Sequence, residues 1–183
     1  MVRVIGGEAR GRKLVLPGRG AVRPTSDFVR EALFNILGPQ DGHLWLDIYA
    51  GTGAVGLEAL SRGAAKAFFI ENSRSCCEAV RANALKCGFE GRVEILEMTA
   101  AQGLQTLGRR GLHFDRIFAD PPYDKGLADP AIIGIEQAGI VTGGAMAVIQ
   151  HSTRELFNVD LGKWELSDKR IYGDTVITIL TRI

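Results

Sequence analysis

The sequence predicts an α/β protein of the doubly wound, Rossmann-like class, built on a mainly parallel sheet. Three observations predict it. Short apolar runs alternate with segments of helical periodicity between residues 43 and 150, a glycine-rich turn follows the first run, and Asp-Pro-Pro-Tyr follows the fourth. Alternating strands and helices form βαβ units, whose strands lie parallel because each helix carries the chain back along the sheet. Such sheets hold ligands at the carboxyl ends of their strands, so both turns are expected at one edge.

Local patterns place the individual elements. A first helix is expected over residues 27–37, because apolar residues from Phe28 to Leu37 recur along one face and Gly38-Pro39 then ends it. The segment KWELSDKRIYGDTVITILTR predicts two strands joined at Gly173-Asp174, a hairpin that puts one antiparallel strand into the sheet. Between them, strands are expected in HLWLDIY, AKAFFI, RVEIL, FDRIFAD and AMAVIQ, and helices over 54–62, 73–87, 100–107 and 128–138.

Residues 1–30 carry an excess of positive charge. They hold seven basic side chains against two acidic ones, whereas the rest of the chain has 15 basic and 19 acidic side chains. A basic segment on a mildly acidic body indicates a polyanionic partner, although composition alone fits a solvated surface segment equally well. VRVI and RKLVLP predict two short strands, so we expect a basic hairpin extension over 1–24 and a domain over 25–183. The candidate RNA contacts are Arg10, Arg12, Lys13, Arg23, Thr25 and Arg30.

Composition excludes several other classes of protein. The 183 residues, 46% of them hydrophobic and 23% charged, are typical of one soluble domain. No long apolar run predicts a membrane span, and the first residues do not resemble a signal peptide, so a cytoplasmic protein is expected. Cys76, Cys77 and Cys87 are interpreted as reduced core thiols. His43 and His113 have no companions that indicate a metal, and no metal is expected.

The glycine-rich turn leaves two nucleotides to be distinguished. Gly51, Gly53 and Gly56 spell the dinucleotide fingerprint, and Glu71, twenty residues after the first glycine, suits a ribose in either case. Asp47, four residues before that glycine, ends the preceding apolar run, so its carboxylate would repel the pyrophosphate of NAD. S-adenosylmethionine carries a sulfonium and an ammonium group and no phosphate. The spacing therefore favours S-adenosyl-L-methionine, with NAD as the alternative.

The segment Asp120-Pro121-Pro122-Tyr123 favours the methyl donor further. The two prolines have no N–H groups and leave a stiff loop of carbonyls, to which Asp120 adds an acceptor and Tyr123 a flat aromatic face. These groups suit a planar base that bears an exocyclic amine. Accepting both N–H bonds would free the nitrogen lone pair for attack on a methyl group, and stacking on Tyr123 would align it. The loop therefore predicts the catalytic residues of an amino-methyltransferase.

These motifs together resemble the ribosomal small-subunit methyltransferase D family. The resemblance rests on RGRKL, RPTSDFVREALFNIL, LDIYAGTGAVGLEALSRGA, DPPY and YGDT, and it extends over nearly the whole chain. It implies a seven-stranded sheet with a reversed last strand, a small N-terminal β extension and methylation of the N2 amine of a guanine in 16S rRNA. It also implies that residues 120–123 line the target base. The cofactor residues would be Asp47, Tyr49, Ala50, Gly51, Gly53, Glu71, Asn72, Thr99 and Ala100.

Three positions depart from the family pattern. Tyr49 stands where the family usually has Phe, and Gln150 stands where it often has Glu before the His-Ser that ends the fifth strand. Thr99 takes the place of an acidic residue that would bind the adenine amine. A hydroxyl accepts such a bond more weakly than a carboxylate, so the change concerns affinity for the cofactor and not the class of reaction.

The expected partner is small-subunit rRNA, either bare or in an assembling small ribosomal subunit. The target guanine must be flipped out or unpaired, because a stacked and paired amine cannot reach the methyl group. Another amino-methyltransferase, acting on DNA or on other RNA, uses the same chemistry and is the first alternative. A non-catalytic RNA-binding module is another. His151 is interpreted as a structural histidine, since an amine that attacks a sulfonium needs no general base beforehand.

Overall fold

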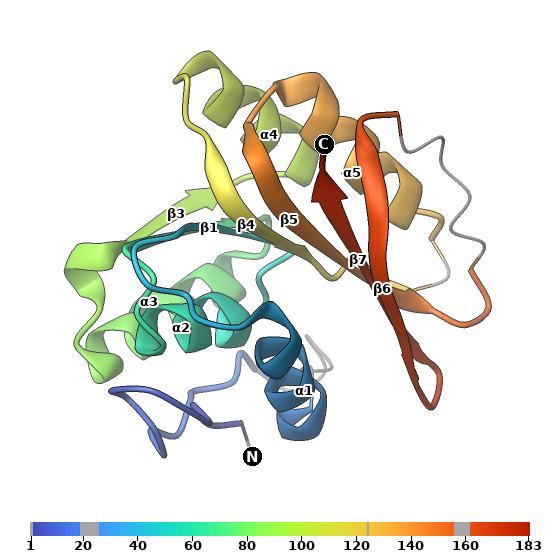
Figure 1. Cartoon of the computed structure of the whole chain (residues 1–183). Coiled ribbons are helices and arrows are strands. Elements are labelled where there is room, and N and C mark those ends of the chain that lie inside the picture. Colours follow the sequence, from blue (N-terminus) through green and yellow to red (C-terminus); the bar gives the residue numbers. More distant parts are fainter. Residues whose placement is uncertain (1, 19–25, 124, 156–161) are drawn as a thin grey trace.

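The chain folds around one sheet of seven strands. The computed structural model describes residues 2–18, 26–123, 125–155 and 162–183. The strands are ordered β3-β2-β1-β4-β5-β7-β6, and only β7 runs against its neighbours. This order confirms the predicted Rossmann-like α/β class and the reversed last strand (Figure 1). The strands are β1 Leu44–Ile48, β2 Lys66–Glu71, β3 Val93–Glu97, β4 Phe114–Ala119, β5 Val141–Ser152, β6 Trp164–Tyr172 and β7 Thr175–Arg182.

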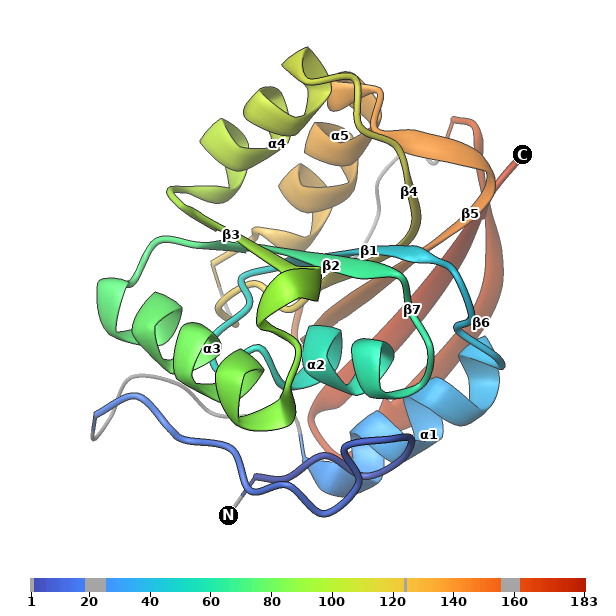
Figure 2. The ribbon, with the colours of Figure 1, turned by 90° about the vertical axis from the view of Figure 1, so that its left-hand side faces the viewer.

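Helices cover both faces of the sheet. Figure 2 shows α1, α2 and α3 on one face and α4 and α5 on the other. The crossovers place them there, because successive parallel strands are joined by right-handed connections. The helices are α1 Asp27–Leu37, α2 Ala54–Ser61, α3 Arg74–Cys87, α4 Ala100–Arg109 and α5 Ala128–Ala138, with a short 3-10 turn at Glu90–Arg92.

Most of the expected elements are confirmed, and two of their details are wrong. The strand expected over 145–150 begins four residues earlier, at Val141, which pairs with Phe114. Gly143 and Gly144 made the sequence unlike a strand at this point. In the structure the pairing of β5 with β4 is irregular there, and Gly144 has a φ of 76°. Phe28 was expected on the apolar face of the first helix, yet its side chain is 68% exposed.

The N-terminal segment lies on α2 and folds back on itself as a short, irregular hairpin. Arg3 and Lys13 form an antiparallel bridge, and the N–H groups of Val4, Gly11 and Leu14 donate to the carbonyls of Arg12, Val4 and Val2 at 3.0, 2.9 and 2.9 Å. The pairing does not extend past Val4, because the buried Glu58 carboxylate accepts the N–H groups of Ile5 and Gly6 at 2.7 and 2.8 Å. We call residues 2–18 the N-terminal arm. The proposed boundary between residues 24 and 25 falls outside the described residues and stays a prediction.

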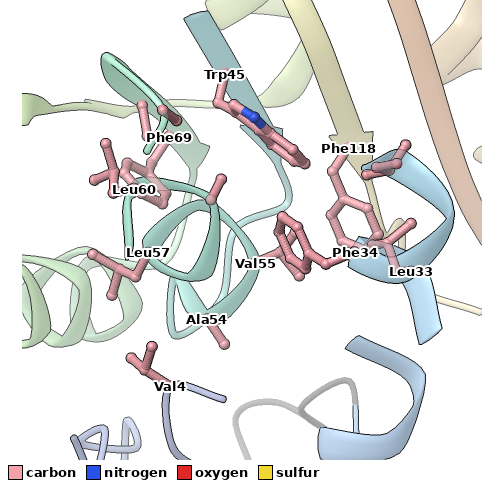
Figure 3. Close-up of a cluster of buried hydrophobic side chains, with 14 of the residues drawn as sticks. Val4, Leu33, Phe34, Trp45, Ala54, Val55, Leu57, Leu60, Phe69 and Phe118 are labelled. Carbon is pink, nitrogen blue, oxygen red and sulfur yellow. The ribbon is translucent and has the colours of Figure 1, made fainter. Parts of the chain in front are cut away.

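Helix α2 is the centre of the core on this face. All eight of its residues are buried, because the sheet covers one side of the helix and the N-terminal arm covers the other. Figure 3 shows Leu57 and Leu60 between Phe69 of β2 and Val4 of the arm. Burying large aliphatic side chains of this kind stabilises a fold by about 1.5–3 kcal/mol each. The turn that precedes α2 is therefore attached to a rigidly packed helix.

Candidate active site at the carboxyl edge of the sheet

The glycine turn connects β1 to α2 through backbone that glycine favours. Gly51 and Gly53 have φ values of 54° and 73°, and Gly53 caps α2. Tyr49 has a φ of 62° and is alone among the described non-glycine residues in having a positive value. Its N–H and that of Ala50 donate to the Ile70 carbonyl at 3.0 and 3.2 Å, which ties the turn to β2. Strained backbone of this kind is typical of functional turns.

Gly56, the third glycine of the fingerprint, has a packing role. A Cβ atom built on it would lie 2.4 Å from the Phe69 ring, so no side chain fits between α2 and β2. Its N–H donates to Asp47 Oδ2 at 3.0 Å. The glycine thus lets the helix approach the sheet closely enough for the carboxylate of β1 to reach the first turn of α2.

Asp47 places an acid beneath the glycine turn. The side chain is only 2% exposed. Burial raises the pKa of the Asp47 carboxyl well above its ordinary value, against the hydrogen bond from Gly56, and the nearby carboxylates of Asp120 and Glu71 raise it further. A cation bound at the turn would relieve both effects, whereas a pyrophosphate would add to the repulsion. The electrostatics of the turn therefore suit a cationic ligand.

Glu71 ends β2 and holds the turn from the other side. Its Oε2 accepts the Gly51 N–H at 2.9 Å, and its Oε1 accepts the Ser73 N–H at 2.8 Å. An ionised carboxylate has about four acceptor positions, so two backbone bonds leave capacity for a diol. The carboxylate therefore orders the turn and still faces the site with acceptors.

A hollow of about 190 Å³ opens between the ends of β1, β2 and β3. It brings together five of the nine predicted cofactor residues, while Asp47, Ala50, Gly51 and Gly53 form the turn beside it. Three further lining residues, Ile70, Met98 and Ala101, were not predicted. Their position at strand ends and in the first turn of α4 was the only available signal, since their side chains are chemically ordinary. The lining residues are Tyr49, Ile70, Glu71, Asn72, Met98, Thr99, Ala100 and Ala101.

Thr99 lines the hollow and also caps α4. Its hydroxyl accepts the Gln102 N–H at 3.4 Å and donates to Gln102 Oε1 at 2.9 Å, and its own N–H donates to the same oxygen. This capping box explains a hydroxyl at this position without any ligand. One lone pair of the oxygen remains for an adenine amine.

The Asp120–Tyr123 segment, which holds the predicted catalytic residues and is called the catalytic loop below, begins where β4 ends. The Asp120 N–H donates to the Ile48 carbonyl at 3.3 Å, which joins the ends of β4 and β1. Pro121 is buried and Pro122 is exposed. Since Asp120 raises the pKa of Asp47, the loop and the glycine turn lie within electrostatic range of each other at the same edge of the sheet, where the fold class places ligands.

Tyr123 is held through its hydroxyl. Gln150 Nε2 of β5 donates to it at 3.0 Å, and Thr175 Oγ1 of β7 lies 3.1 Å from it. The sequence had marked Gln150 only as a departure from the family and Thr175 only as part of a motif. Adjacent residues of a strand point to opposite faces, so His151 points away from this site. Buried and bonded to Thr178 Oγ1 at 3.1 Å, it has the environment of a structural histidine.

The predicted RNA contacts separate into three groups. Arg10, Arg12 and Lys13 are exposed and form no ion pair within the described part of the chain. Arg30 is fully buried, where it donates to the Arg3 carbonyl at 2.6 Å and to Asp27 at 2.8 Å. Its guanidinium thus attaches the N-terminal arm to α1, and we omit it from the proposed RNA surface. Arg23 and Thr25 lie outside the described residues.

Asn83 of α3 joins the N-terminal arm to the glycine turn, a role that the sequence did not indicate. Its Oδ1 accepts the Val15 N–H at 2.6 Å, and its Nδ2 donates to the carbonyls of Val15 and Thr52 at 3.0 Å each. The side chain is fully buried, and an asparagine inside an amphipathic helix was the only signal. The amide therefore supports the turn from the side opposite to the sheet.

Three features of the rest of the described chain bear on the site. No cluster of three His, Cys, Asp or Glu side chains that could hold a metal occurs among the described residues. Cys76, Cys77 and Cys87 are free thiols. No helix in the described ranges is both long and apolar enough to cross a membrane.

Comparison with known proteins identifies the family. The profile described as "Conserved hypothetical protein 95" matches residues 2–181. Ribosomal RNA small subunit methyltransferase D of Escherichia coli is 35% identical over 183 residues, which cover 99% of this chain and 90% of that protein. The chain belongs to this methyltransferase D family. Membership makes it a methyltransferase and removes the NAD oxidoreductase alternative.

Two further relatives support the membership in the methyltransferase D family. The Bacillus subtilis protein named "Putative rRNA methyltransferase YlbH" is 30% identical and covers 97% of both chains. The solved structure of "Putative methyltransferase yhhF from Escherichia coli" is 34% identical, with a TM-score of 0.85 and coverage of 99% of this chain and 97% of that one. The similarity thus includes the N-terminal arm as well as the sheet.

Proposed function

We propose that this protein transfers the methyl group of S-adenosylmethionine to the exocyclic N2 amine of a guanine in small-subunit rRNA. The observation that carries the proposal is the buried Asp47 carboxylate beneath the glycine turn, with Asp120 and Glu71 close enough to raise its pKa. Three acids around a nucleotide-type turn suit a sulfonium and an ammonium group. The names of the methyltransferase D relatives supply the rRNA substrate.

Residues around the hollow hold the cofactor in this proposal. Glu71 accepts hydrogen bonds from the ribose hydroxyls, Asp47 faces the cationic end, and Thr99 accepts a bond from the adenine amine. Asn72 and Ala100 line the hollow with Tyr49, while Ala50, Gly51 and Gly53 let the backbone pass close to the ligand. S-adenosylmethionine supplies an electrophilic methyl group, whose bond to sulfur breaks as the amine nitrogen bonds to carbon.

The catalytic loop activates the amine. Asp120 and the Pro121 carbonyl accept its two N–H bonds, which localises the lone pair on nitrogen, and preorganised acceptors of this kind cost no reorganisation during the reaction. Tyr123 stacks on the guanine, and its hydroxyl bonds with Gln150 and Thr175 hold the ring in one orientation. After transfer the extra amine proton passes to Asp120 or to water. Pro122 keeps the loop rigid.

The proposal is tested by tritiated-methyl transfer followed by mass mapping of the RNA. Bare small-subunit rRNA, assembled small subunits and DNA are each offered with S-adenosylmethionine. We expect one methylated guanine in small-subunit rRNA, with the added mass on the base. Transfer to DNA or to other RNA would favour the first alternative function. RNA binding without transfer to any substrate would favour a non-catalytic module.

Neutralising the N-terminal arm is expected to weaken RNA binding in a salt-dependent way. Arg10→Ala and Lys13→Ala together remove two exposed charges. The plot of log K against log salt should become shallower, its slope falling in magnitude by roughly 1.5–2, because two fewer counterions are released. Binding measured by fluorescence anisotropy between about 50 and 200 mM salt gives this slope. An unchanged slope would mean that the arm is only a solvated surface.

A matched control for the arm removes the same charge elsewhere. Arg109 and Lys163 are exposed basic residues near the opposite, amino edge of the sheet. Replacing both with alanine should leave the salt slope near that of the unmodified protein. Affinity for S-adenosylhomocysteine should be unaffected in both double variants, since neither pair lines the hollow.

Asn83→Asp is expected to weaken cofactor binding, although Asn83 does not line the hollow. The change replaces a donor by an acidic oxygen that faces two carbonyls, so the Thr52 side of the glycine turn loses its support. We expect the free energy of unfolding to fall by about 1–3 kcal/mol and affinity for S-adenosylhomocysteine to fall about tenfold. Urea denaturation and calorimetric titration measure the two effects. Ala82→Asp, on the exposed side of the same helix, is the control; equal affinities in both variants would contradict the supporting role.

A further inference from the structure

A pair of aromatic side chains, of which Phe28 is exposed and Tyr172 partly buried, lies beside the catalytic loop. Phe28, in the first turn of α1, is 68% exposed, and its ring meets that of Tyr172 edge to face with centroids 5.7 Å apart. Tyr172 is the last residue of β6. Edge-to-face packing on one neighbour orients a ring and leaves most of it accessible. Tyr172, packed against the core, therefore orders the Phe28 ring as an apolar surface in water.

The topology places this pair at the edge of the sheet that carries the site. Helix α1 ends before β1 begins and packs along the sheet, so its first turn lies at the carboxyl edge; Figure 2 shows α1 beside β6 and β7. Tyr172 pairs with Thr175 across the hairpin. Thr175 Oγ1 lies 3.1 Å from the Tyr123 hydroxyl. Thr175 thus connects Tyr172 to Tyr123, the residue that is proposed to stack on the target base.

The size of the surface indicates its occupant. Ile171 is 63% exposed, but adjacent residues of a strand point to opposite faces, so it does not enlarge the patch. Asp27 and Arg3, next to Phe28, form an ion pair at 3.2 Å and give the ring a polar surround. A protein interface buries about 800 Å² on each partner, far more than one ring offers. A single unpaired base matches a single aromatic face.

We propose that Phe28, held by Tyr172, is a stacking site for an unpaired RNA base next to the target guanine. The inference rests on the proposed function, because it takes the catalytic loop as the place where the target base is presented. Extrusion of one base leaves its neighbour unstacked, and a second platform would compensate for the lost stacking. Phe28 is thus a substrate-positioning residue at the mouth of the site.

Three variants test the stacking site by steady-state kinetics on small-subunit rRNA. Phe28→Ala should raise KM for RNA by about tenfold or more, in line with the loss of one base–aromatic stack, while affinity for S-adenosylhomocysteine stays unchanged. Phe28→Trp should restore KM. Leu85→Ala is the matched control, because Leu85 is 66% exposed on α3 and should leave KM unchanged. A normal KM in Phe28→Ala overturns the proposal.

A second measurement does not depend on turnover. Trp45 and Trp164 are buried, so the indole introduced by Phe28→Trp would be the accessible one, and a stacked base should quench its fluorescence when single-stranded small-subunit rRNA fragments are added. The absence of quenching overturns the stacking site even if the enzyme methylates RNA. Quenching in a protein that transfers no methyl group would count against the proposed function alone. A Phe28→Ala defect seen only with assembled subunits would assign the ring to a ribosomal protein and overturn the proposal.

Discussion

Replacing Asp120 with alanine is expected to lower the rate of methyl transfer by about 10²–10³, as for the loss of one preorganised electrostatic partner. The carboxylate accepts an amine N–H in the proposed mechanism, and Asp120 is the charged acceptor within the Asp-Pro-Pro-Tyr segment. Single-turnover transfer to small-subunit rRNA measures the effect directly. Affinity for S-adenosylhomocysteine should stay nearly intact, because Asp120 does not line the hollow.

Asp120→Asn separates the two roles that Asp120 can play. The amide retains one acceptor oxygen but has no charge and cannot take the proton. Partial activity would favour the hydrogen-bonding role, and complete loss would favour a carboxylate that accepts the proton. Asp41→Ala is the control, since Asp41 is an exposed acid before β1, at the opposite edge of the sheet. If Asp120→Ala transfers methyl groups at the normal single-turnover rate, the catalytic residues must lie elsewhere.

Glu71→Ala is expected to weaken binding of S-adenosylhomocysteine by about 1–3 kcal/mol, or roughly 5- to 150-fold. The substitution removes the ribose acceptor and also the bonds to the Gly51 and Ser73 N–H groups that order the turn. Calorimetric titration measures the affinity. Thermal unfolding should show a loss of stability as well, because two backbone donors in a mostly buried site lose their partner.

Glu71→Gln distinguishes support of the turn from contact with the ribose. The glutamine retains one carbonyl oxygen, so it can satisfy one backbone N–H but not both backbone groups and a diol. We expect intermediate affinity and near-normal stability. Glu78→Ala removes an exposed glutamate of α3 and is the control. Unchanged affinity in Glu71→Ala would exclude the ribose role.

Local sequence patterns were sufficient for the elements and for the type of site. Helix 27–37 and helix 128–138 have the bounds that periodicity and glycine stops predicted. Asp47 and the glycine turn lie in one short stretch of the chain, and Asp-Pro-Pro-Tyr is another. Their chemistry can therefore be interpreted from the sequence without knowledge of the fold. The alternation of strands and helices then places both at one edge, because parallel strands share their carboxyl ends.

Contacts between distant segments determined what the sequence could not indicate. Glu58 takes the N–H groups of Ile5 and Gly6, so the hairpin of the arm pairs only around Arg3 and Lys13. Arg30, which the sequence placed among the RNA contacts, is buried under the same arm. Such choices depend on which donor meets which acceptor once the chain is folded, and residues more than twenty positions apart carry no local pattern that records the pairing.

The sequence by itself determined the fold class, the acids at the turn and the composition of the catalytic loop, since each depends on neighbours in the chain. Only the tertiary structure decided that Gly56 is required by the Phe69 ring, that Gln150 and Thr175 hold Tyr123, and that Asn83 supports the glycine turn. It also decided that Phe28 faces solvent while the rest of its stripe is buried or partly buried. Burial and hydrogen-bond partners are properties of the packed chain, because a side chain's environment is made by segments that are remote from it in sequence.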